Sequence, residues 1–151
     1  MSERTIFQAM SRRHVLSLAP TATVHEAACV MTRANCGSVL VIDNSVADHR
    51  QQLLGIVTER DLMTRVLAKA LDPTQTTVAK IMTPNPQCVS PELRVADAVL
   101  IMIERGFRHL PVLAANGKIL GVFSVRDALP REVNTAVSLS EFNEQVNDAL
   151  G

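Results

Sequence analysis

Gly55-Ile-Val-Thr-Glu-Arg-Asp61 and Gly121-Val-Phe-Ser-Val-Arg-Asp127 repeat one pattern of residue types in the same order. Each stretch has a glycine, two apolar residues, a hydroxyl residue and, after one variable position, the pair Arg-Asp. This order predicts a strand that gives way to a helix at the hydroxyl residue. Because the pattern occurs twice, it indicates a longer internal repeat on either side of it.

The two patterns are the ends of two longer segments with the same order of elements. Upstream of each, apolar residues recur at the spacing of one helix face, namely Val24, Ala27, Ala28 and Met31 in the first segment and Val95, Ala98, Val99 and Met102 in the second. Thr23 and Glu26 form a capping box in front of the first of these helices. Two apolar strands follow each helix, predicted at 38–42 and 53–57 and again at 109–113 and 118–123. The fold class is therefore α/β (α+β), with a duplicated helix–strand–strand–helix order.

The parts outside this shared order also carry local signals. Residues 44–52 are polar and predict a longer loop between the strands of the first repeat. A further helix is predicted from Thr58 to about Leu71, where Asp72-Pro73 ends it. In the C-terminal segment, 131–151, a capping box at Ser138 predicts a short amphipathic helix that packs on its own repeat or on a second subunit. We place the first repeat at 6–72 and the second at 73–130.

Composition restricts the class of function. Lys and Arg number 15, as do Asp and Glu, so no net field attracts nucleic acid or an anionic membrane. Four Phe and no Trp or Tyr leave few rings on which bases could stack. No apolar run approaches the ~18 residues that span a bilayer, and the N-terminus lacks the apolar stretch of a signal peptide. The three cysteines have no CxxC spacing, which predicts reduced, buried thiols in a cytoplasmic protein and no zinc site.

The repeated pattern has two chemical interpretations. A helix N-terminus with an adjacent arginine, Arg60 or Arg126, suits a phosphate, and the carboxylates of Asp61 and Asp127 are acceptors for ribose hydroxyls. The alternative is an ordinary helix cap, because a hydroxyl and a carboxylate three residues apart satisfy free backbone N–H groups. Capping alone does not require the arginine, so its recurrence with the preceding glycine favours a nucleoside phosphate.

The duplicated order of elements and the two patterns resemble the cystathionine β-synthase (CBS) domain family. Val78-Ala-Lys-Ile-Met-Thr-Pro84 is similar to that family's lead-in to a repeat, and the resemblance covers roughly Ile6 to Leu129. It implies two βαββα repeats packed through their sheets in a pseudo-twofold disc, the Bateman module. It further implies two clefts between the repeats that bind AMP, ADP, ATP, NADH, S-adenosylmethionine or a related adenosyl ligand.

The resemblance also implies the site residues of each cleft. In one cleft, Asp127 would hold the ribose, Ser124 and Arg126 the phosphate, and Val122, Leu16, Cys36 and Gly37 the base, with 11–14 near the phosphates. The other cleft would use Asp61, Thr58, Arg60 and Ile56 together with Thr83, Gln87, Phe107 and Arg108. Arg108 would reach phosphates in either cleft, whereas its counterpart Gly37 cannot, so the two clefts are expected to differ.

Three function classes follow. The first is a regulatory module, not an enzyme and requiring no cofactor, that senses an adenosyl ligand as a homodimer and passes the signal to an enzyme or transporter. The second is a structural dimerisation or scaffold module without a physiological nucleotide. The third is an enzyme, which is disfavoured because no nucleophile–base pair, metal cluster or phosphate-binding glycine loop is visible in the sequence. Nucleic acid and membranes are not expected partners.

Overall fold

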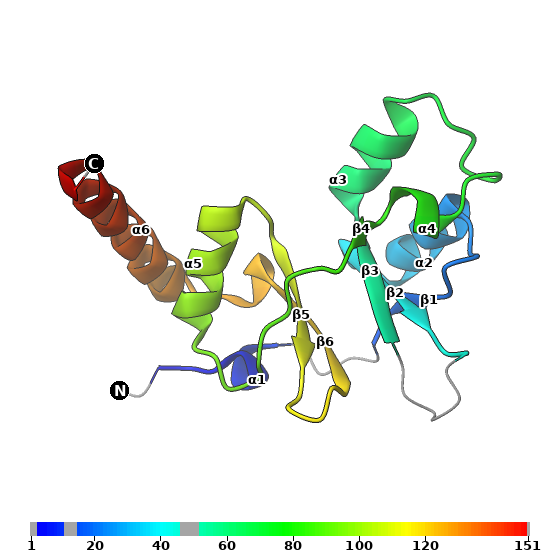
Figure 1. Cartoon of the computed structure of the whole chain (residues 1–151). Helices are drawn as coiled ribbons and strands as arrows, with labels where there is room; N and C mark the ends of the chain where they lie inside the picture. Colours follow the sequence, from blue (N-terminus) through cyan, green and yellow to red (C-terminus); the bar gives the residue numbers. More distant parts are fainter. Residues whose placement is uncertain (1–2, 11–14, 46–51, 151) are drawn as a thin grey trace. The chain divides into compact units, whose positions relative to one another are not determined.

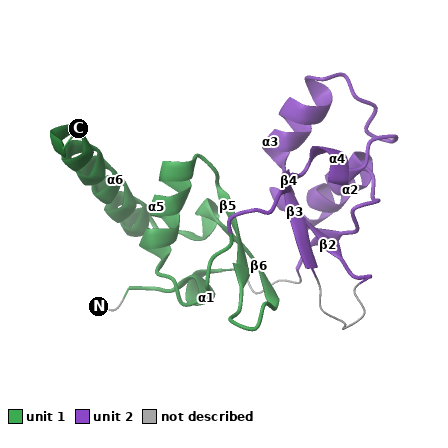
Figure 2. Ribbon diagram, in the orientation of Figure 1, with its two compact units in different colours: residues 1–13, 88–151 green, residues 14–87 purple. Residues whose placement is uncertain are grey.

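The computed structural model describes residues 3–10, 15–45 and 52–150 (Figure 1). The chain forms two compact units, which do not follow the order of the chain (Figure 2). Unit 2 consists of His14–Gln87, and unit 1 combines Met1–Arg13 with Cys88–Gly151. The N-terminal segment therefore belongs to the unit that contains the second copy of the repeated pattern.

Unit 2 is a four-stranded sheet with helices beside it. Its elements are β1 (Ser17–Leu18), α2 (Val24–Ala34), β2 (Ser38–Asp43), β3 (Gln52–Thr58), α3 (Glu59–Asp61), η1 (Leu62–Leu67), α4 (Val78–Ile81) and β4 (Thr83–Pro84). The sheet order is β1-β2-β3-β4, with β1 parallel to β2 and the other neighbours antiparallel. Thr23 caps α2, its hydroxyl accepting from the backbone N–H of Glu26 at 3.1 Å. The two predicted strands of the first repeat and the helix that precedes them are confirmed.

Unit 1 repeats this plan with a smaller sheet. Its elements are α1 (Ile6–Ala9), α5 (Val95–Arg105), β5 (His109–Leu113), β6 (Ile119–Ser124), η2 (Val125–Asp127) and α6 (Pro130–Leu150). Strands β5 and β6 pair antiparallel, and Val89 bridges Val112 in parallel, in the position that β1 takes in unit 2. The fold class is α/β, as predicted, and both units contain the helix–strand–strand–helix order.

Each short lead-in helix packs in the unit that holds the pattern of the other repeat. Helix α1 donates from the Ile6 N–H to the Leu93 carbonyl at 2.8 Å, and its side chains join the apolar core of unit 1. Helix α4 donates from the Val78 N–H to the Ala22 carbonyl at 2.8 Å and joins the core of unit 2. Both units are therefore completed by a segment from the neighbouring repeat.

The alternating and continuous apolar runs of the strands supply the two cores. In unit 2, strand β2 is buried along almost its whole length, and Val24, Ala27 and Met31 of α2 pack against it. In unit 1, Phe123 of β6 is fully buried among α5 and α1 residues, and α6 adds Ala136. The helix faces predicted from apolar spacing are thus the faces that are buried.

The helix predicted from Thr58 to about Leu71 differs from the observed one. It starts as predicted, but from Leu62 to Leu67 the turn is π-helical, and it ends at Leu67. The Ala68 N–H donates to the Met63 carbonyl and the Leu71 N–H to the Val66 carbonyl, each five residues back. Ala70 has a left-handed φ of 53°, which no α-helix accommodates, so the last turn is lost before Asp72.

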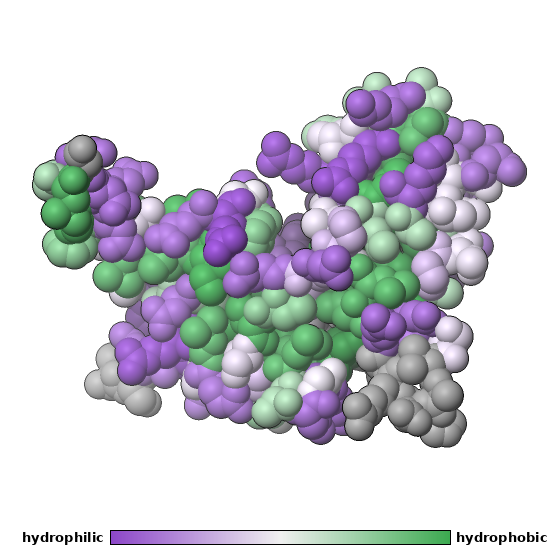
Figure 3. Space-filling view, in the orientation of Figure 1, coloured by the Kyte–Doolittle hydropathy of each residue, from purple (hydrophilic) through white to green (hydrophobic). Residues whose placement is uncertain are grey.

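The predicted cap at Ser138 is wrong, because α6 already begins at Pro130 and runs through that position without a break. Proline is favoured in the first helical turn, and the Glu132 carboxylate accepts from the Leu129 N–H at 2.7 Å, which caps this start. Beyond the buried Ala136, α6 exposes Leu139, Phe142 and Leu150 (Figure 3, where the apolar surface of its end is green).

Candidate functional site

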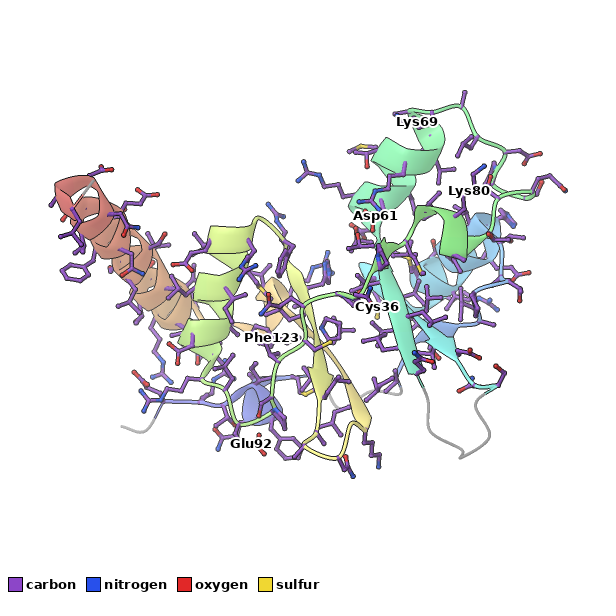
Figure 4. All side chains as sticks on the ribbon, in the orientation of Figure 1. Cys36, Asp61, Lys69, Lys80, Glu92 and Phe123 are labelled. Atoms are coloured by element: carbon purple, nitrogen blue, oxygen red, sulfur yellow. The ribbon has the colours of Figure 1, made fainter. Side chains whose placement is uncertain are left out.

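The first repeated pattern forms a reciprocal helix cap at the end of β3. Thr58 Oγ1 accepts from the backbone N–H of Asp61 at 3.3 Å, and Asp61 Oδ2 accepts from the backbone N–H of Thr58 at 2.9 Å. Figure 4 shows Asp61 where β3 passes into α3. The capping interpretation of these two residues is confirmed, and it uses one of the two carboxylate oxygens.

The second pattern forms the same kind of cap at the end of β6. Asp127 Oδ2 accepts from the backbone N–H of Ser124 at 2.9 Å, and Ser124 Oγ accepts from the backbone N–H of Arg126 at 3.3 Å. The helix here is a single 3₁₀ turn, so the hydroxyl reaches the second N–H instead of the third. Both aspartates are therefore held in a fixed position at the end of a strand.

The charged groups around the two caps differ in exposure. Asp61 is only 8% exposed, Asp127 is partly exposed, and the neighbouring Arg60 and Arg126 are exposed. Burial raises the pKa of the Asp127 carboxyl above its ordinary value, although the Ser124 N–H and the charges of Arg4 and His109 act in the opposite direction. A ligand that offers hydroxyl donors would find a partly desolvated acceptor at Asp127.

Strand pairing brings further predicted residues beside the caps. In unit 2, Ile56 pairs with Thr83 across β3 and β4, and the Gly37 carbonyl accepts from the Glu59 N–H at 3.1 Å. In unit 1, the Arg108 carbonyl accepts from the Val125 N–H at 3.2 Å. Gly37 and Arg108 thus occupy the same position relative to the two caps, which agrees with their assignment as counterparts.

The predicted site residues divide between the two units. Unit 2 holds Leu16, Cys36, Gly37, Ile56, Thr58, Arg60, Asp61, Thr83 and Gln87. Unit 1 holds Phe107, Arg108, Val122, Ser124, Arg126 and Asp127. Each predicted cleft draws on residues of both units, and the two clefts stay predictions. Segment 11–14, predicted to approach the phosphates, and most of the 44–52 loop lie outside the described residues.

Comparison with known protein families identifies this arrangement. The model of the CBS domain matches the chain twice, at residues 6–68 and 78–132. Together the two matches cover most of the chain, and each ends just beyond one of the caps. The chain belongs to the CBS domain family. It carries a tandem CBS pair, as the resemblance implied.

Relatives of this CBS pair include uncharacterised and structurally known proteins. An uncharacterised 17.7 kDa protein of Acidianus ambivalens is 39% identical over 108 residues, which are 72% of this chain and 61% of that protein. A putative signal-transduction protein with CBS domains from Burkholderia ambifaria has 31% identity and a TM-score of 0.72, covering 81% of this chain and 86% of its own.

A third CBS relative was solved with a ligand. The CBS domain protein PAE2072 from Pyrobaculum aerophilum, complexed with AMP, has 25% identity and a TM-score of 0.75. The match covers 90% of this chain and 99% of that chain.

Three charged residues that the sequence analysis did not single out lie beside the CBS caps. Arg65 Nε is 3.6 Å from Asp61 Oδ1, and the Arg4 guanidinium donates to the Asp127 carbonyl at 3.1 Å and to Glu132 Oε1 at 2.6 Å. The four-residue spacing of Asp61 and Arg65 on one helix is a sequence signal for the first pair. The Arg4–Glu132 pair joins distant parts of the chain and has no local signal.

Three further predictions from the sequence concern metal sites, membrane spans and thiols. Within residues 3–10, 15–45 and 52–150, no group of three or more His, Cys, Asp or Glu side chains could hold a metal ion. No helix in this described part is long and apolar enough to cross a membrane. No disulfide joins the three cysteines, but the prediction of buried thiols is wrong for Cys29, which lies on the exposed side of α2, while Cys36 and Cys88 are partly buried.

Proposed function

We propose that this CBS pair is a regulatory module that binds an adenosine-type nucleotide and is not itself an enzyme. In this proposal the ligand binds in a cleft between the repeats, with the ribose on an aspartate of the repeated pattern and the phosphate near its arginine. The ligand class comprises AMP, ADP, ATP, NADH and S-adenosylmethionine, and AMP is the first to test. No cofactor is required.

The observation that carries the proposal is the geometry of the caps. Each cap fixes an aspartate beside an exposed arginine at a strand end, and the cap bond uses only Oδ2 of each carboxylate. A pre-positioned carboxylate binds ribose hydroxyls without an entropic cost for ordering its side chain. The AMP complex of the Pyrobaculum aerophilum relative supports the same ligand class for this chain.

The proposal predicts a measurable loss on truncating Asp127. A hydrogen bond to a charged group contributes about 1.5–3 kcal/mol, so Asp127→Ala should weaken AMP binding by roughly tenfold or more. Isothermal titration calorimetry on the whole chain measures this directly. Asp148→Ala, which removes an exposed carboxylate of α6 far along the helix from the cap, is the matched control and should bind AMP like the wild type.

The second candidate function is a scaffold module without a nucleotide. It is favoured by the fact that capping alone accounts for Thr58, Asp61, Ser124 and Asp127. A thermal-shift panel of the five ligands separates the two functions, because a ligand that binds the native state raises its melting temperature. A chain that shifts with none of the five would be a scaffold.

The raised pKa of Asp127 predicts a pH dependence. Adenosine, which has no phosphate to titrate, should bind more weakly as the pH falls through the pKa of Asp127, because protonation removes the charged acceptor of the ribose hydroxyls. Since burial raises this pKa above 3.8, the loss should begin at a higher pH than for an ordinary aspartate. Titrations from pH 7.5 to about pH 4.5 test this, and Asp127→Asn should abolish the dependence.

The remaining parts of the proposal concern partners and compartment. We propose a homodimer that acts on a separate enzyme or transporter, because ligand binding between two repeats can change the surface offered to a partner. Three cysteines without a disulfide fit the reducing conditions of the cytoplasm. Sedimentation of the chain with and without AMP would measure both the oligomeric state and its response to the ligand.

A further inference from the structure

The two CBS caps have the same spacing of residues but different ionic surroundings. In unit 2, Arg65 lies four residues after Asp61, and its Nε is 3.6 Å from the carboxylate oxygen Oδ1 that the cap does not use. Two side chains at this spacing lie next to each other on a helix. The charge of Asp61 therefore already has an internal partner.

Arg65 also holds the lead-in helix in place. Its Nη1 donates to the carbonyl of Ile81 at 2.9 Å and to that of Met82 at 3.2 Å. These carbonyls are at the C-terminal end of α4, where a helix presents unpaired acceptors and partial negative charge. Asp61 and Arg65 together thus clasp α4 to the rest of unit 2.

In unit 1 the chain places an arginine at the same offset, but it cannot form this contact. Arg131 follows Asp127 by four residues, yet Ala128 is extended and a new helix begins at Pro130, so Asp127 and Arg131 do not share a helix. Arg131 takes no part in the ion pairs Arg4–Glu132, Arg65–Asp61 and Arg94–Glu3.

The clasp of unit 1 uses a different carboxylate. Arg4, just before α1, forms a bidentate pair with Glu132 through Nε–Oε2 at 3.2 Å and Nη2–Oε1 at 2.6 Å. It touches Asp127 only at the backbone carbonyl, at 3.1 Å. Glu132 therefore does in unit 1 what Asp61 does in unit 2, and the Asp127 carboxylate is not needed to hold the lead-in segment.

We propose that the two caps have separate roles, with Asp127 as the carboxylate that binds the ribose and Asp61 as part of a structural clasp with Arg65. This inference rests on the proposed nucleotide function and assigns the binding of the ribose to the cap of unit 1. Asp61 is 8% exposed and Asp127 is more accessible, which agrees with the division. The charges of Arg4 and His109 oppose the rise of the Asp127 pKa that burial causes.

The test compares two isosteric variants of the whole chain, Asp127→Asn and Asp61→Asn, with AMP as the probe. Asp127→Asn should weaken AMP binding by about tenfold or more and change the melting temperature little. Asp61→Asn should lower the melting temperature and weaken AMP binding at least about fivefold less than Asp127→Asn does. Equal losses of affinity, or a larger loss for Asp61→Asn, would overturn the inference.

A third variant tests the inference even if Asp61→Asn does not fold. Arg65→Gln removes the clasp while the Asp61 carboxylate stays, so it should lower the melting temperature and leave the AMP affinity unchanged. A change in AMP affinity in Arg65→Gln would mean that the Asp61 cap binds the ligand. If the wild type binds AMP but the three variants do not show these differences in affinity and melting temperature, the division of roles is wrong. If the wild type binds none of the five adenosyl ligands, both proposals fall.

Discussion

Replacing Gly55 with alanine should lower the free energy of unfolding by about 2–3 kcal/mol, in the upper part of the range for overpacked cores. A Cβ at this position would lie 2.5 Å from Met82 Sδ, 2.8 Å from Met82 Cγ and 2.8 Å from the backbone oxygen of Thr83. Strand β3 pairs on both sides here, with Val41 and with Pro84, so the backbone of Gly55 cannot move away. Urea unfolding followed by circular dichroism gives the difference.

A double variant separates the two causes of this clash. Met82→Ala removes Sδ and Cγ but leaves the Thr83 oxygen, so Gly55→Ala should cost less in the Met82→Ala background than in the wild type, though more than nothing. Strict additivity of the two substitutions would show that Met82 is not the obstacle. A Gly55→Ala protein as stable as the wild type would contradict the observed approach of α4 to β3.

The glycine of the repeated pattern therefore has a structural cause that the sequence did not reveal. Its recurrence with the arginine favoured a nucleotide over a cap, but Gly55 is required by the close approach of Met82. At Gly121 an added Cβ would lie 2.9 Å from Met10 Cε, so the same methionine contact occurs in unit 1. The glycine is thus no evidence for a ligand, whereas the exposed Arg60 and Arg126 are not explained by capping.

The elements predicted correctly are those that depend on neighbours in the chain. Helix α2 and strand β2 follow from apolar spacing and from the Thr23 cap, which act over a few residues. The exchange of lead-in helices depends on contacts between distant segments, and local patterns do not contain it. A comparison of Thr5-Ile-Phe-Gln-Ala-Met10 with Thr77-Val-Ala-Lys-Ile-Met82 would have identified α1 as the counterpart of α4.

The candidate site shows the same difference between local features and long-range contacts. Residue types alone gave the caps as the alternative to a nucleoside phosphate site, because a hydroxyl and a carboxylate at this spacing satisfy the first N–H groups of a helix. The different partners of Asp61 and Asp127 were not expected. Pro130 is a sequence signal for this difference, because it starts a new helix at a position where the helix of the first repeat continues without a break. Residue types therefore indicated the caps that the two repeats share, but not the ion pairs that distinguish them.

Glu132→Gln should cost about 1.5–3 kcal/mol of stability at neutral pH, the range for hydrogen bonds to a charged group. The Glu132 carboxylate is buried and accepts from Arg4 Nε, Arg4 Nη2 and the Leu129 N–H, so it joins the N-terminal segment to the start of α6. A neutral amide keeps the size of the side chain and loses the ion pair. Urea unfolding at pH 7 measures the cost, and Glu3→Gln, which breaks the exposed pair with Arg94, should cost under about 1 kcal/mol.

The pH dependence of this cost identifies the ion pair as its cause. Burial alone would raise the pKa of Glu132, but the hydrogen bond and charge of Arg4 and the Leu129 N–H outweigh it and hold the pKa below 4.5. A carboxyl whose pKa is lowered by folding stabilises the protein above its unfolded pKa, and this stability is lost as the pH falls through the folded pKa. The difference between the wild type and Glu132→Gln should therefore be complete at pH 6–7 and shrink below about pH 4.5. A difference that stays constant down to about pH 3 would assign the loss to packing, and the Arg4 clasp would then contribute nothing as an ion pair.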